Sequence, residues 1–156
     1  MYNTNNEGQL RYEKVSKDVI LNLVFSPFMY SFFIWLSYLS VGTKSIMYFY
    51  SMSAGSILIL IFFFYSTFRM LSRQNRTISG INFSNDYYTI KTDKILWLKA
   101  KEYEIKKSMI RIKNRKFDWY DKNTDKIGAS IFINDLELFL VKDYFDDYDI
   151  IIKLFA

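Results

Sequence analysis

The densest group of charged side chains in the sequence is basic and contains no acid. It consists of Lys106, Lys107, Arg111, Lys113, Arg115 and Lys116. In an extended strand, Arg111, Lys113 and Arg115 would point to one face, and the isoleucines between them to the other. Such a face suits an anionic ligand, above all the phosphates of lipid headgroups. A solvated strand face that binds nothing would show the same pattern, so both interpretations stand.

Other reactive chemistry is largely excluded by composition. The sequence contains no Cys and no His, which excludes thiol nucleophiles, disulfides, Cys/His zinc sites and histidine general bases. No nucleophile–base motif or phosphate-binding Gly loop occurs. The largest acidic group is Asp143, Asp146, Asp147 and Asp149. It lacks the Gly turn and distal Glu of a calcium loop and is typical of a helix N-terminus. We expect a protein that is not an enzyme and holds no cofactor or metal.

Two apolar stretches determine where these residues can act. They run from Val19 to Val41 and from Ile46 to Phe68, and neither contains a charged side chain. At about 1.5 Å rise per residue, each would cross a hydrocarbon core of about 30 Å as a helix. The sequence therefore predicts a transmembrane helical hairpin over 19–68, a tail over 1–18 and a separate domain over 69–156. Residues 9–18 could form a short interfacial helix or a flexible tail.

The distribution of basic residues predicts the orientation of this hairpin. Three cations precede the first stretch, one lies in the connecting loop and three follow the second stretch. They are Arg11, Lys14 and Lys17, then Lys44, then Arg69, Arg73 and Arg76. Because Lys and Arg accumulate on the cytoplasmic side, we predict a multi-pass protein of the inner cell membrane with both termini in the cytoplasm.

Within the hairpin, three residues bear on helix packing. Pro27 lacks an N–H and is expected to kink the first helix. Ser51 and Gly55 form a small-xxx-small pair that allows close helix approach. This pair could form a homodimer seam or pack against the first helix of the same chain. No charged residue lies at membrane depth, so a transporter or channel is not favoured.

The C-terminal part has the alternation of short strands separated by turn residues. The predicted strands cover residues 77–83, 87–91, 94–100 continuing or restarting at 103–107, 109–113, 116–120, 128–133 and 136–141. The dipeptide Asn134-Asp135 suits the turn of the last hairpin. Apolar residues then recur at helical spacing over 142–155. The fold predicted for 69–156 is a small antiparallel β barrel or sandwich closed by a C-terminal helix, as in pleckstrin-homology-like (PH-like) domains.

The same region resembles the bacterial YcxB-like family, whose C-terminal part is PH-like. Trp119 in KFDWYDK matches the Trp-bearing strand of that family. Lys142 and Phe145 match its Pro-Lys-x-x-Phe pattern, in which Val141 replaces the Pro. The family has no established general activity, although related small membrane proteins serve as toxin-immunity factors.

These observations favour a membrane-anchored binding or regulatory protein that presents the β domain at the cytoplasmic membrane surface. Its partners would be the bilayer, anionic lipid headgroups, a membrane protein or a second copy of the chain. One alternative is an immunity protein that protects the cell membrane against a secreted bacterial toxin, and another is a subunit of an oligomeric pore. Nucleic acid is not an expected partner, because the net charge is only +5 and the chain is predicted to be membrane-bound.

Overall fold

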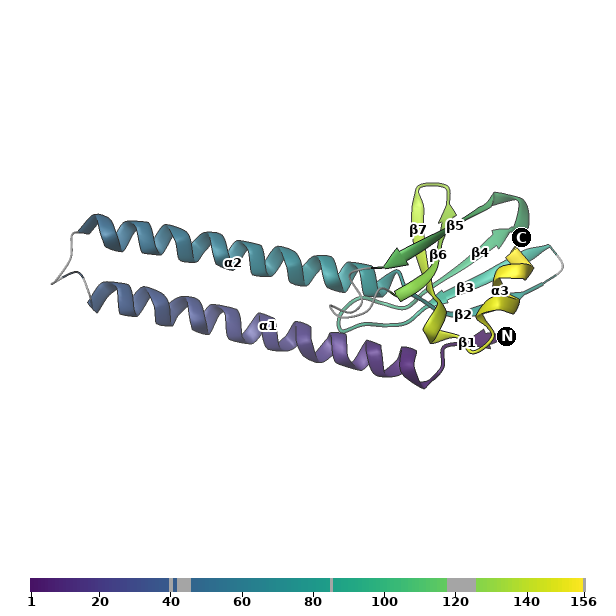
Figure 1. Ribbon diagram of the computed structural model, residues 1–156, viewed down its shortest axis with the longest axis horizontal. Helices are drawn as coiled ribbons and strands as arrows, with labels where there is room; N and C mark the ends of the chain where they lie inside the picture. Colours follow the sequence, from purple (N-terminus) through teal and green to yellow (C-terminus); the bar gives the residue numbers. More distant parts are fainter. Residues whose placement is uncertain (40, 42–45, 85, 118–125, 156) are drawn as a thin grey trace. The chain divides into compact units, whose positions relative to one another are not determined.

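The computed structural model describes residues 1–39, 41, 46–84, 86–117 and 126–155 (Figure 1). The chain divides into two compact units. Unit 1 is Met1–Val15 together with Ser72–Ala156, and unit 2 is Ser16–Leu71. The predicted connecting loop with Lys44, and Trp119 of the family resemblance, lie outside the described residues.

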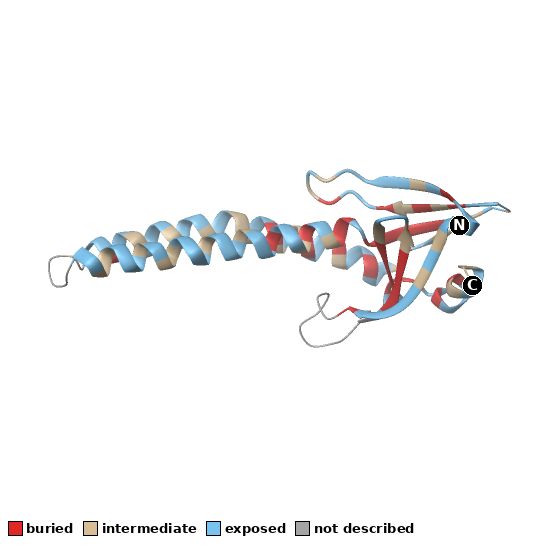
Figure 2. Cartoon of the chain, turned by 90° about the horizontal axis from the view of Figure 1, so that it is seen from above, coloured by how far each residue is buried: buried red, intermediate tan, exposed pale blue. Residues whose placement is uncertain are grey.

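Two long apolar helices make up unit 2. Helix α1 spans Asn6–Leu39 and helix α2 spans Ile46–Asn75, and both are long and apolar enough to cross a membrane. Within unit 2 they run side by side in opposite directions (Figure 1). Figure 2 shows that most of their length is exposed. Apolar side chains exposed over such an area require apolar surroundings, which these two helices do not provide for each other.

The first helix begins earlier than its apolar stretch, and its start belongs to unit 1. Asn5 caps α1, because its Oδ1 accepts a hydrogen bond from the backbone N–H of Gly8 at 3.1 Å. The buried Tyr12 hydroxyl donates to the carbonyl oxygen of Thr77 at 2.7 Å. The short strand β1 (Tyr2–Asn3) pairs with a strand of the β domain. The first fifteen residues are therefore part of that domain and not a separate tail.

Seven strands form two antiparallel sheets in unit 1. The first sheet has the order β1-β2-β3-β4, with β2 at Ile78–Phe83, β3 at Tyr87–Thr92 and β4 at Lys101–Lys106. The second has the order β5-β6-β7, with β5 at Ile110–Phe117, β6 at Lys126–Ile133 and β7 at Leu136–Val141. The 3-10 turn Lys107–Met109 connects them. The predicted small antiparallel β domain is confirmed.

The predicted C-terminal helix is also present but starts later than expected. A 3-10 turn at Lys142–Tyr144 precedes helix α3, which spans Tyr148–Phe155. Ile151 of α3 is fully buried and joins a core of side chains from both sheets. The strand residues of this core include Ile81, Ile90, Ile131 and Leu138. The helix and the two sheets thus share one hydrophobic core.

The second sheet leaves no room for a side chain at Gly128. A Cβ atom at this position would clash with the carbonyl oxygen of Leu140 and would lie 2.7 Å from Cε2 of Phe117. Only a residue without a side chain permits this approach. In the same sheet, the backbone N–H of Phe139 donates to the carbonyl oxygen of Arg76 at 3.0 Å, which links β7 to the residues just before β2.

Three predicted strands differ in the structure. The stretches 109–113 and 116–120 correspond to the single strand β5 as far as Phe117. The stretch 94–100 is not a strand. Ile95 and Leu98 instead exchange two backbone hydrogen bonds of 3.0 and 2.9 Å around a two-residue turn. A short run of apolar residues favours a strand, but this segment finds no neighbouring strand to pair with among the described residues.

Candidate functional site

Six cations follow one another from the end of β4, through the 3-10 turn and along β5. We call them the basic surface: Lys106, Lys107, Arg111, Lys113, Arg115 and Lys116. All six are exposed. The cations that lie close together in the sequence therefore also follow one another in the structure, because the 3-10 turn between β4 and β5 is part of the same segment.

The register of β5 determines which of these side chains share a face. Arg111, Lys113 and Arg115 pair with Phe132, Ser130 and Gly128 of β6, so the three cations lie on one face, as predicted. Ile110, on the opposite face, packs against the hydrophobic core. Arg115 Nη1 lies 2.8 Å from Glu137 Oε1 of β7. This ion pair fixes the position of the Arg115 side chain. The other two cations on this face, Arg111 and Lys113, are exposed to solvent.

The other cations of the surface carry few partners within the described part of the chain. Lys107 Nζ lies 5.8 Å from the ring centroid of Tyr88, a cation–π contact that fixes its position. Among the described residues, Lys106, Arg111 and Lys113 make no ion pair. Such cations can donate hydrogen bonds to phosphate oxygens without first breaking an ion pair.

The position of β5 supplies a second explanation for its charges. In the order β5-β6-β7, β5 is an edge strand. Lys and Arg on an edge strand discourage pairing with another chain. Protection of this edge against strand pairing is compatible with ligand binding. By itself, however, it does not require six cations within residues 106–116 and no acid between them.

The cations at the end of the second apolar stretch do not all join the basic surface. Arg69 lies in unit 2, whereas Arg73, in the last turn of α2, and Arg76, just after that helix, lie in unit 1. The strand that follows them, β2, belongs to the four-stranded sheet, and β5 belongs to the other one. The two groups are thus connected to different sheets.

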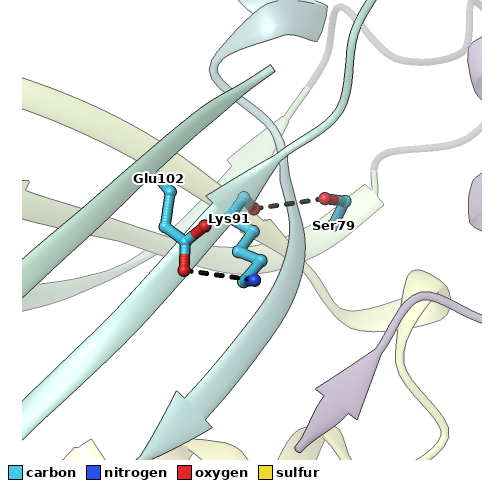
Figure 3. A network of polar contacts seen from close by, with 3 residues as sticks. All are labelled: Ser79, Lys91 and Glu102. Carbon is cyan, nitrogen blue, oxygen red and sulfur yellow. Dashed lines mark hydrogen bonds and ion pairs between the residues drawn. The ribbon is translucent and has the colours of Figure 1, made fainter.

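A polar cleft of about 410 Å³ lies over the first sheet. Its floor is a row of residues opposite one another on four strands, namely Asn3, Gly80, Lys91 and Glu102. Lys91 Nζ lies 3.1 Å from Glu102 Oε1, and the hydroxyl of Ser79 donates to the carbonyl oxygen of Lys91 at 3.2 Å (Figure 3). The lysine and the glutamate neutralise each other. This ion pair links β3 to β4 across the floor of the cleft.

The hydroxyl of Ser79 has a local structural role. The pairing of β2 with β3 shifts between Ile78 and Gly80, so Ser79 is the extra residue of a β-bulge. Its side chain is buried, and its carbonyl oxygen accepts a hydrogen bond of 2.9 Å from the N–H of Thr4. Sequence reasoning missed this network because its members come from three strands and from Thr4, which follows β1.

Unit 2 contains an apolar groove of about 700 Å³ between its helices. Ser51 and Gly55 line it, opposite residues of α1 such as Phe25 and Met29. No atom lies within 4 Å of a Cβ built at Gly55, so the small residues do not bring the two helices into close contact. Pro27 lies inside α1 and does not end it. A homodimer seam through Ser51 and Gly55 stays a prediction.

The perturbed titratable groups of unit 1 are tyrosines. Burial raises the pKa of Tyr148, and the charge of Asp149 raises it further. Burial also raises the pKa of Tyr103, and the neighbouring Arg76 partly offsets this shift. Within the described residues, no group of three or more acidic side chains could hold a metal ion. These tyrosines are held in their neutral form and lie outside the basic surface.

Comparison with known proteins adds no relative. No protein family, no curated protein and no solved structure matches this chain.

Proposed function

We propose that this protein is a membrane-anchored, non-enzymatic binding module whose basic surface contacts anionic lipid headgroups. In this proposal α1 and α2 cross the inner cell membrane, both termini are cytoplasmic, and unit 1 faces the cytoplasmic leaflet. One observation carries this proposal. Two long, exposed apolar helices belong to the same chain as a domain with six exposed cations between residues 106 and 116.

Electrostatics supports this function quantitatively. Each Lys or Arg close to an anionic bilayer contributes about 1 kcal/mol of attraction. A peripheral protein would spend much of that energy on reaching the membrane, whereas an anchored domain is already there. Even a few contacts from the basic surface would then orient unit 1 on the leaflet. The membrane-exit cations Arg69, Arg73 and Arg76 would add to the same attraction.

The order of elements in unit 1 supports a PH-like domain. A four-stranded and a three-stranded antiparallel sheet are followed by a terminal helix that packs into their common core. The proposed relationship to YcxB-like proteins rests on this order, on Lys142 and on Phe145. Binding at a phosphate-bearing surface fits such a domain without any catalytic group.

Binding of unit 1 to vesicles tests the proposal. A chain in which a Gly-Ser linker replaces Ser16–Leu71 retains both parts of unit 1, and near-UV circular dichroism checks that it is folded. We expect it to sediment with vesicles that contain phosphatidylglycerol and to remain in solution with phosphatidylcholine alone. Arg111→Glu combined with Lys113→Glu should weaken binding at least about 30-fold, because two contacts of about 1 kcal/mol are lost and two carboxylates repelled by the anionic surface are added.

The matched control separates the basic surface from net charge. Lys14→Glu combined with Lys153→Glu changes the net charge equally, but both residues lie outside the basic surface. We expect this double variant to bind nearly as well as the parent chain. Equal losses in the two double variants would mean that only net charge matters. Undiminished binding after Arg111→Glu and Lys113→Glu would remove β5 from the proposed function.

A further inference from the structure

The connection between β3 and β4 carries an apolar turn that no sequence motif accounts for. Leu96 and Trp97 form the tip of this turn, closed by the hydrogen bonds between Ile95 and Leu98. The side chain of Trp97 is 54% exposed, although it is the largest apolar side chain of the segment. Exposed turn tips are normally polar or contain Gly, because water solvates them.

The backbone of this turn makes its composition more unusual. Leu96 has a φ of 52°, a left-handed conformation that Gly and Asn adopt readily and Leu does not. The β6–β7 turn provides a comparison within the same chain. Asn134 also has a φ of 52° there, and the polar Asp135 follows it. The β6–β7 turn thus has residues that readily adopt its backbone conformation, whereas the turn between β3 and β4 has Leu and Trp, which do not.

The base of the apolar turn is attached to the end of α2. Asn75 is the last residue of that helix, and its Nδ2 donates to the carbonyl oxygens of Asp93 and Lys99, each at 3.3 Å. Ile95 is 1% exposed and holds the turn from within unit 1. One amide group therefore fixes both ends of the segment 93–99 to the point where α2 ends.

Chain length then limits how far the turn can lie from a membrane. Asn75 follows Phe68, the last residue of the second apolar stretch, by seven positions of the same helix. At about 1.5 Å per residue, Asn75 lies about 10 Å beyond the end of that stretch. If the stretch spans the hydrocarbon core, Asn75 lies at the outer edge of the headgroup layer, which extends about 5–8 Å from that core.

The side chains of the segment match that environment. Tryptophan accumulates at the boundary between lipid and water, where its ring is partly apolar and its N–H is polar. Lys94 and Lys99 flank the tip, are exposed and can reach lipid phosphates. We infer that residues 93–99 form an interfacial anchor that inserts Leu96 and Trp97 among the headgroups of the bilayer that α2 crosses. This inference rests on the proposed membrane location but not on lipid binding by β5.

Depth-dependent fluorescence quenching tests the inference in the full-length chain. The double variant Trp35→Phe and Trp119→Phe keeps Trp97 as the single tryptophan and leaves the turn unchanged. The protein is placed in nanodiscs that carry a nitroxide either at the headgroup or deep in the acyl chain. We expect the headgroup nitroxide to quench Trp97 about twofold more than the deep nitroxide, as for an interfacial ring. Iodide in the water should quench it weakly.

A second single-tryptophan variant separates this inference from the proposed function. Trp97→Phe with Trp119→Phe keeps Trp35, which lies in the first apolar stretch. If lipid nitroxides quench Trp35 but not Trp97, the anchor is refuted and the membrane location stands. If neither is quenched by lipid, the membrane location itself fails. Strong iodide quenching of Trp97, or resistance of Trp97 to every quencher, would equally overturn the anchor, because its ring would lie in water or within protein.

Discussion

Leu96 and Asn134 share a φ of 52°, and each is the first residue of a two-residue turn. A left-handed conformation costs an ordinary L-residue about 1–2 kcal/mol, less for Asn. The fold accepts this cost at Leu96, which indicates that the side chain at this position has a use beyond turn formation. The two turns therefore form a natural pair of test and control.

Exchanging the residue types between the turns should separate stability from membrane contact. In Leu96→Asn, relief of backbone strain offsets the loss of a partly buried side chain, so we expect the free energy of unfolding to change by less than about 1 kcal/mol. Quenching of Trp97 by headgroup nitroxides should nevertheless fall. In Asn134→Leu, an exposed position gains strain without packing, and we expect a loss of about 1–2 kcal/mol with Trp97 quenching unchanged. Urea unfolding in detergent micelles measures the first quantity. Unchanged Trp97 quenching in Leu96→Asn together with reduced quenching in Asn134→Leu would contradict the proposed anchor.

The attachment of the turn to α2 depends on the amide of Asn75. Asn75→Asp keeps the shape of the side chain but removes both hydrogen bonds to the carbonyl oxygens of Asp93 and Lys99. Asn75 is buried, so we expect a loss of about 1–3 kcal/mol and faster hydrogen exchange over residues 93–99. Asn82→Asp makes the same substitution at an exposed strand position and should leave both unchanged. Unaltered exchange in Asn75→Asp would show that the turn is held by other contacts.

The lack of room at Gly128 makes a prediction about this glycine. Gly128→Ala would place a methyl group against the carbonyl oxygen of Leu140, and the strand backbone must move. We expect a destabilisation of about 1–3 kcal/mol in thermal unfolding, as for other overpacked sites. In Gly80→Ala the nearest atom is Oδ1 of Asn3 at 3.0 Å, at the end of a side chain that can rotate. This variant should lose less stability than Gly128→Ala, and equal losses would mean that the close packing at Gly128 is not a constraint.

The regular elements of this fold were predictable from local patterns. Uninterrupted apolar stretches predicted the helices, and alternation with turn residues predicted strands that end near the observed positions. Asn134-Asp135 identified its turn because the positive φ there suits Asn. The β1 strand was not predictable, because two residues carry no period, and its pairing depends on Gly80 some 77 positions away in sequence.

The segment 94–100 shows where the pattern fails. Its short run of apolar residues indicates a strand, but its hydrogen bonds are made with Asn75 at a helix end and within its own two-residue turn. Such long-range attachments have no sequence signature. The basic surface was visible because its members are consecutive, whereas the Lys91–Glu102 pair depends on the register between two strands. A group of side chains close together in the sequence was thus predictable, whereas a contact between residues of two different strands was not.

Cysteine labelling in whole cells tests the central claim that α1 and α2 span the membrane with unit 1 in the cytoplasm. The chain has no Cys, so single variants need no further change. Thr43→Cys lies in the predicted external loop, and Lys106→Cys lies on the basic surface. With this topology, we predict that a membrane-impermeant maleimide labels Thr43→Cys in intact cells and labels Lys106→Cys only after permeabilisation. Labelling of Lys106→Cys in intact cells would contradict it.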